Sequence, residues 1–176
     1  MILEFFDYFS AWATNPLGRS HVLAAILALM AGPILFLSLK GTIKHKWLGY
    51  FYVVAMLLVN GTALSHYTLT GTFNLFHFFA IFSAATIIPA TWFIWRAKKT
   101  GSKNSYMGHA IMMSWSYFGL FAALISETAT RQFPYLFSGE TIWSRFLVFL
   151  FIFLTIGAWW THRMINKNVP RILENY

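Results

Sequence analysis

Five apolar segments dominate this sequence and limit what it can fold into. We place them at Ser20–Leu39, Trp47–His66, Leu75–Trp95, Met107–Ser126 and Ile142–Trp160. A helix needs about 20 residues, at ~1.5 Å each, to cross the ~30 Å hydrocarbon core of a bilayer. Because backbone groups in lipid must bond within their own segment, we expect helices and not strands. The sequence therefore predicts an all-α integral membrane protein.

The composition supports the same class and narrows the chemistry. Of the 176 residues, 58% are hydrophobic and 10% are charged, which is too much apolar surface for a soluble domain of this size to bury. The chain contains no cysteine, which excludes disulfides, thiolate catalysis, iron–sulfur clusters and cysteine zinc sites. Any bound metal would need histidine, carboxylate or methionine ligands.

The basic residues gather on one side of the predicted spans. Ten of the thirteen follow the first, third or fifth span: Lys40, Lys44, Lys46, Arg96, Lys98, Lys99, Lys103, Arg163, Lys167 and Arg171. The positive-inside rule makes this side cytoplasmic, so the net charge of +8 indicates topology, and we expect no nucleic-acid partner. We predict a multi-pass protein of a bacterial inner membrane, with its N-terminus outside and its C-terminus in the cytoplasm.

We interpret the chain as a single transmembrane domain, residues 1–176. Apolar side chains at helical spacing near the N-terminus predict an amphipathic surface helix, which Asn15 and Pro16 would end. Short connections make neighbouring spans antiparallel, so the first four are expected to form a four-helix bundle, with a peripheral, lipid-facing fifth span. The predicted parts are the interfacial helix at 1–16, the core at 20–126, the fifth span at 142–160 and a cytoplasmic tail at 161–176.

Four histidines begin four consecutive spans: His21, His45, His77 and His109. Since successive spans run in opposite directions, the first and third of these histidines lie near the outer face and the other two near the inner face. Two histidines on facing helices can supply both axial ligands of a haem iron. The pattern therefore indicates a path for electrons across the membrane, although a single interfacial histidine also serves as an ordinary anchor or helix cap.

Basic residues lie where haem propionates would emerge. Lys44 and Lys46 are at the inner face and Arg131 is at the outer face, and a cation pairs well with a carboxylate. Positive-inside topology accounts for such residues equally well.

This layout resembles the cytochrome b561 family of two-haem transmembrane oxidoreductases, whose four core helices carry one ligand histidine each. The resemblance covers His21 to His109. It implies that His21 pairs with His77, and His45 with His109, around one or two b-type haems. Our own hypothesis adds an electron donor such as a quinol or another small reductant, and an acceptor such as ferric iron or a partner redox protein.

Two longer phrases resemble a second family. The strings KGTIKHKWLGYFY and GHAIMMSWSYFGL, the latter followed by ETATR, are similar to a bacterial membrane family catalogued as domain of unknown function 2306. This resemblance covers most of the chain and implies a multi-spanning membrane protein without assigning an activity.

A different set of residues at the outer face favours zinc. His21, His66, His77 and Glu127 can converge there, and three imidazoles with a carboxylate match a zinc site that activates water. Alkaline ceramidases, which are membrane hydrolases, look similar in this respect. Glu127 also lies four residues before Arg131 and can simply pair with it. A zinc-dependent membrane hydrolase and a cofactor-free membrane scaffold thus remain open beside the haem interpretation.

Overall fold

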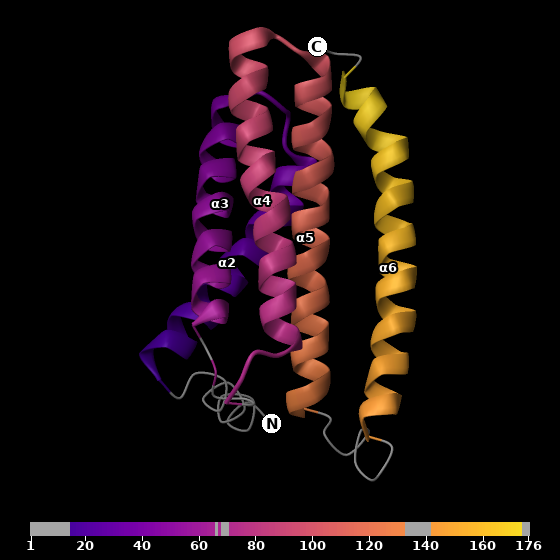
Figure 1. The fold of residues 1–176 in the computed structure, drawn as a ribbon. Helices are drawn as coiled ribbons and strands as arrows, with labels where there is room; N and C mark the ends of the chain where they lie inside the picture. Colours follow the sequence, from indigo (N-terminus) through magenta and orange to yellow (C-terminus); the bar gives the residue numbers. More distant parts are fainter. Residues whose placement is uncertain (1–14, 66, 68–70, 133–141, 174–176) are drawn as a thin grey trace. The chain divides into compact units, whose positions relative to one another are not determined.

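The computed structural model describes residues 15–65, 67, 71–132 and 142–173, and every regular element within them is a helix (Figure 1). The helices are α2 (Pro16–Leu37), α3 (Ile43–Leu64), α4 (Leu75–Thr100), α5 (Lys103–Gln132) and α6 (Ile142–Leu173). Each is long and apolar enough to cross a membrane, which confirms five candidate spans, all of them helical, in the described part of the chain. The amphipathic helix predicted at 1–16 falls almost wholly on residues 1–14, outside the described part of the chain.

The chain divides into two compact units, Met1–Ala84 and Ala85–Tyr176. Their boundary falls inside α4, so residues 75–84 of this helix belong to unit 1 and residues 85–100 to unit 2. Unit 1 contains α2, α3 and the beginning of α4. Unit 2 contains the remainder of α4 together with α5 and α6.

In unit 1, α2 and α3 pack against each other as a helical hairpin (Figure 1). Asn15 caps α2 by accepting a hydrogen bond from Gly18 N at 2.7 Å, and Pro16 suits the first helical position because its missing N–H needs no partner there. The chain turns at Gly41, whose φ of 78° favours glycine, and Thr42 caps α3. The buried residues follow helical spacing: Ala24, Ala28, Ala31, Gly32 and Leu35 on α2, and Tyr52, Ala55, Met56, Val59 and Asn60 on α3.

Lys40 closes the C-terminal end of α2. Its ammonium group donates hydrogen bonds to the carbonyls of Leu35 at 2.7 Å and Phe36 at 3.0 Å, where the helix dipole also favours a cation. Partial burial lowers the pKa of Lys40 from its ordinary 10.5 because loss of water disfavours the charged amine.

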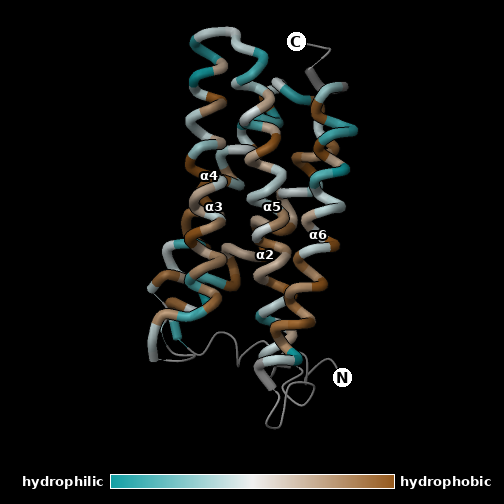
Figure 2. The backbone as a smooth tube through the Cα atoms, turned by 45° about the vertical axis from the view of Figure 1, so that its right-hand side comes forward, coloured by the Kyte–Doolittle hydropathy of each residue, from teal (hydrophilic) through white to brown (hydrophobic). Residues whose placement is uncertain are grey.

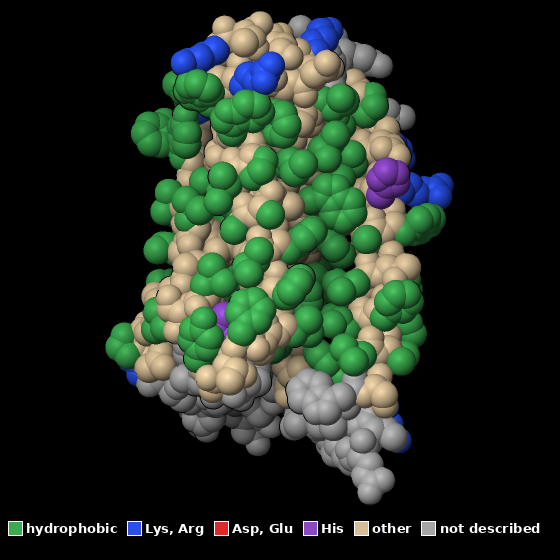
Figure 3. Space-filling view, viewed as in Figure 1, with side chains coloured by type: hydrophobic (Ala, Val, Ile, Leu, Met, Phe, Trp, Pro, Cys, Tyr) green, Lys and Arg blue, Asp and Glu red, His purple; other side chains and the backbone are tan. Residues whose placement is uncertain are grey.

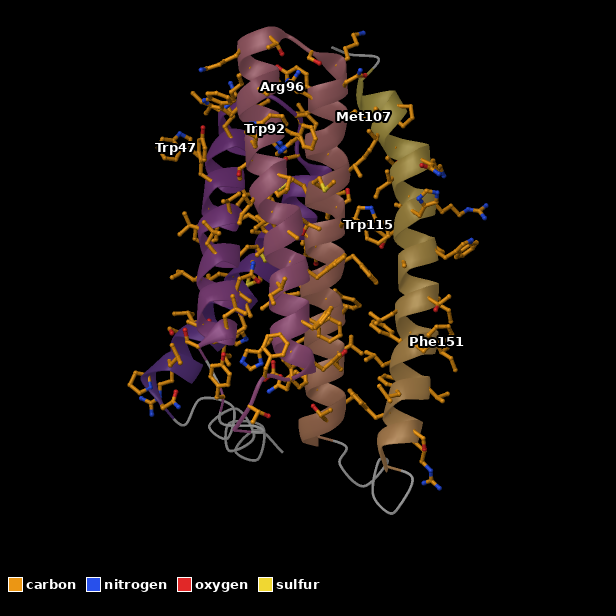
Figure 4. All side chains as sticks on the ribbon, viewed as in Figure 1. Trp47, Trp92, Arg96, Met107, Trp115 and Phe151 are labelled. Carbon is orange, nitrogen blue, oxygen red and sulfur yellow. The ribbon has the colours of Figure 1, made fainter. Side chains whose placement is uncertain are left out.

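In unit 2, two glycines allow close approach between neighbouring helices. A Cβ at Gly108 of α5 would lie 3.0 Å from three ring atoms of Phe93 on α4, and a Cβ at Gly157 of α6 would lie 2.5 Å from Cε2 of Phe118 on α5. Figure 4 shows Trp115, one turn before Phe118, projecting from α5 toward α6. The ring of Phe118 therefore packs over the bare backbone of α6.

The helix α6 continues past the predicted end of the fifth span at Trp160. Residues 161–173, which the sequence analysis placed in a tail, are helical. Ile165 and Val169, one turn apart on the same face, are both buried, and burial of this face favours further helix. Pro170 lies three residues before the end of α6, so its missing N–H removes one backbone hydrogen bond in the last turn and leaves the rest of the helix intact. The sequence analysis followed the apolar run, which ends near Trp160, and it assigned no helix to the residues beyond that point.

Polar and apolar residues are distributed along the helices as a bilayer requires. Figure 2 shows hydrophobic residues along the middle of the helices and hydrophilic ones near many of their ends. In Figure 3, hydrophobic side chains cover the sides of the helices, and Lys and Arg side chains lie near the turn between α4 and α5. Tryptophan and cation pairs, typical of a membrane interface, occur in unit 2: Trp92 with Arg96 at 5.3 Å (Figure 4), Trp95 with Lys99 at 3.8 Å and Trp159 with Arg163 at 5.5 Å.

Candidate functional site

His45 lies in the first turn of α3 and its ring is held by the end of α2. Its Nδ1 is 2.9 Å from the hydroxyl of Ser38, and that hydroxyl donates its single proton to the carbonyl of Leu35 at 2.9 Å. With its proton on that carbonyl the hydroxyl can only accept from the ring, and in this arrangement Nδ1 of His45 carries the proton. The lone pair of the neutral imidazole is then on Nε2.

His21 on α2 has the same arrangement with a partner on α3. Its Nδ1 is 2.9 Å from the hydroxyl of Thr62. That hydroxyl lies 2.6 Å from the carbonyl of Leu58 and 3.0 Å from that of Val59, which can only accept a proton from it. When the hydroxyl donates to one of these carbonyls, His21 donates through Nδ1 and also carries its lone pair on Nε2.

His109 provides the simplest case because its partner is a backbone carbonyl. Its Nδ1 lies 2.9 Å from the carbonyl oxygen of Ala90, which can only accept, so Nδ1 must be protonated. This bond links α5 to α4 within unit 2. The ring of His109 is half-buried.

His77 has the opposite tautomer. The backbone N–H of Asn74 donates to its Nδ1 at 3.2 Å, while the Asn74 side chain accepts from Phe76 N at 3.0 Å. This is a reciprocal cap of α4 in which histidine replaces the usual Glu or Gln. Because Nδ1 accepts, the neutral ring of His77 carries its proton on Nε2. Among the described residues that Nε2 has no hydrogen-bond partner, although the side chain is only 1% exposed.

The four histidines thus fall into two chemical classes. Metal-binding histidines commonly donate one ring N–H to a carbonyl or another oxygen, which fixes the ring and leaves the other nitrogen as the ligand. His21, His45 and His109 each place Nδ1 against an oxygen in this way. His77 instead presents an N–H, which cannot coordinate a metal unless its bond to Asn74 is lost.

The remaining predicted haem contacts are less defined. Lys44 and Lys46 flank His45 and are exposed, as propionate partners would be. Arg131 lies within α5 near its C-terminal end, but its side chain is outside the described part. Gly108, beside His109, leaves no room there for a flat ring, because the ring of Phe93 already packs over it.

The predicted zinc residues are not brought together within the described part of the chain. There, no group of three histidine and carboxylate side chains could hold a metal ion. His66 lies outside the described residues, so the set His21, His66, His77 and Glu127 stays a prediction. Glu127 is half-buried on α5.

Sequence reasoning missed the residues that orient the histidines: Ser38, Thr62, Asn74 and Ala90. Asn74 could have been found, because Asn three residues before His at the start of a helix is a local capping pattern. The partners of His21 and His109 are separated from them by 41 and 19 residues. They depend on how helices pack, which the sequence alone does not give.

Comparisons with known proteins identify the family without assigning an activity. No curated protein and no solved structure matches the chain. One family model does match, described as "Predicted membrane protein (DUF2306)", over residues 18–163. This stretch contains all four histidines and most of the five candidate spans. The chain therefore belongs to the DUF2306 family of predicted membrane proteins.

Proposed function

We propose that this protein binds b-type haem in a bacterial inner membrane and transfers electrons across it, with its N-terminus outside and its C-terminus in the cytoplasm. His45 and His109 would be the axial ligands of a haem near the cytoplasmic face. Their pairing follows from the order of the histidines along the chain. The observation that carries the proposal is that each ring, in its own unit, donates through Nδ1 and has its lone pair on Nε2.

The chain's own groups would hold and orient the rings. The Ser38 hydroxyl, itself bound to the carbonyl of Leu35, orients His45, and the carbonyl of Ala90 orients His109. Lys44 and Lys46 are exposed beside His45 and suit the propionates. When bound, haem would supply reversible one-electron chemistry, with a potential set by its bis-imidazole ligation and apolar surroundings.

The outer haem is less well supported than the inner one. His21 has the ligand tautomer, but His77 uses Nδ1 as an acceptor in the cap of α4 and so carries a proton on Nε2. We therefore propose one haem and not two. A quinol or another small reductant as donor, and a redox protein as acceptor, complete the proposal.

The test is the visible spectrum of protein purified from a haem-replete host, recorded before and after dithionite. We expect a Soret band in the wild type that is lost in His45→Ala and in His109→Ala. His162→Ala is the matched control because His162 is exposed on α6 and interacts with Asn166. The control should keep the band, and size-exclusion chromatography should show that all three variants remain folded.

Two results would reject the haem proposal. One is a colourless protein that cannot be reconstituted with added haem, which would favour a cofactor-free scaffold. The other is stoichiometric zinc that is lost in His66→Ala, which would favour the hydrolase.

A further inference from the structure

His77 is a buried hydrogen-bond donor that lacks an acceptor. Its side chain is 1% exposed, and among the described residues its Nε2 has no partner. Buried donors in folded proteins are almost always satisfied, because leaving one unpaired in an apolar environment is costly. An unsatisfied donor that is buried this completely therefore indicates that a bound molecule supplies the acceptor.

Aromatic rings flank this donor. The ring of His77 lies 4.5 Å from that of Tyr67 and 5.1 Å from that of Phe73, at interplanar angles of 37° and 32°. Tyr67 is 45% exposed and Phe73 is 54% exposed, so each can turn aside without disrupting the packed interior of unit 1. A flat molecule can stack in this environment and reach the Nε2–H of His77.

The stretch of chain that carries His77 favours a neutral molecule. From Trp47 to Trp95 the chain has no Lys, Arg, Asp or Glu, so this stretch offers no countercharge to a phosphate or a carboxylate. Phenylalanines at 76, 78, 79 and 82 surround His77 in the sequence. The acceptor that fits is a carbonyl oxygen on an otherwise apolar molecule.

A second buried donor lies near the same end of unit 1. Asn60, in the last turns of α3, is 5% exposed, and its Nδ2 has no partner among the described residues. The end of α3 and the start of α4 are joined directly by residues 65–74, so both donors are close to this connection.

We propose that this end of unit 1 binds the head group of a membrane quinone, with Nε2–H of His77 donating to a quinone carbonyl oxygen. A quinone is flat, uncharged and soluble in the bilayer, and it carries carbonyl acceptors, so it meets each requirement above. The inference deepens the proposed function by identifying a bilayer quinol as the electron donor. Only this role as electron donor rests on the proposed function. Binding itself requires no haem.

The experiment uses detergent-purified full-length protein with ¹⁵N-labelled histidine rings, titrated with decylubiquinone. We expect a saturable shift of the His77 Nε2–H resonance, which is assigned by its absence in His77→Phe. The phenylalanine retains the aromatic packing and removes the donor, so the dissociation constant should rise about tenfold, as expected for one hydrogen bond. Because this variant lacks the His77 signal, the dissociation constants of all variants are measured by isothermal titration calorimetry. The exposed control His162→Phe should bind as the wild type does.

Three results would overturn the inference: no saturable shift, equal affinity in His77→Phe, or a shift caused by phosphatidylcholine alone that decylubiquinone does not change. The last would assign the acceptor to a lipid ester carbonyl. Failure of the haem proposal is distinguishable, because a colourless protein that binds decylubiquinone rejects haem and supports this site. A haem-loaded protein without saturable quinone binding supports the haem proposal and rejects the quinone site.

Discussion

Replacing Gly108 with alanine tests the packing that holds His109 in place. A Cβ at this position would lie 3.0 Å from three atoms of the Phe93 ring. Optimal carbon–carbon contact is about 3.5–4.0 Å, so the ring must move by roughly 0.5 Å or more. Ala90, the acceptor for His109 Nδ1, is one turn away from Phe93 on the same helix. Displacing that part of α4 should therefore also weaken the hydrogen bond to His109.

Gly49→Ala is the matched control, and it shows how much a glycine-to-alanine change alone alters the stability of a helix. No atom lies within 4 Å of a Cβ at Gly49 in α3, so this change should stabilise by up to about 1 kcal/mol through helix propensity. Gly108→Ala gains the same stabilisation from helix propensity but loses about 1–3 kcal/mol because the new methyl group overpacks against Phe93. The two variants should thus differ by about 1–3 kcal/mol, or roughly 2–12 °C in apparent Tm for a chain of this size.

The assay is thermal unfolding in detergent micelles, followed by circular dichroism. Phe93→Leu combined with Gly108→Ala should recover much of the lost stability, because a leucine can move away from the new methyl group. Equal Tm values for Gly108→Ala and Gly49→Ala, or no recovery in the double variant, would refute the proposed contact between α4 and α5.

Two further predictions concern the turn of the hairpin and His21. The lowered pKa of Lys40 means that the folded state loses this proton before the unfolded chain does, so stability should rise with pH from the lowered pKa up to about 10.5. The Tm of the wild type relative to Lys40→Met should increase between pH 8 and pH 10.5, and a decrease would contradict the burial of this amine. Thr62→Val removes the acceptor of His21 Nδ1 and should cost about 0.6 kcal/mol, typical of hydrogen bonds between membrane helices. In ¹⁵N ring spectra His21 should then populate both tautomers, and an unchanged spectrum would argue against the assigned bond.

The sequence predicted the spans well because long apolar runs are a direct consequence of the bilayer's thickness. It predicted their ends poorly. Hydropathy falls near Trp160, yet α6 continues because Ile165 and Val169 still bury one face.

The candidate site was likewise predicted only in part. The sequence showed which positions are histidines and in what order they occur. The tautomers of His21 and His109, in contrast, depend on partners from other helices. Only His77, whose partner Asn74 is three residues away, had a local signal. That signal shows why the four histidines are not equivalent.

The number of haems per chain tests the central claim most directly. It is measured on purified protein by the pyridine haemochrome method against the protein concentration from amino-acid analysis. We expect one b-type haem per chain, lost in His109→Ala and retained in His77→Phe, because only His77 lacks the ligand tautomer. Two haems per chain, with one lost in His77→Phe, would contradict the assigned role of His77, and no haem in any preparation would contradict the proposed function.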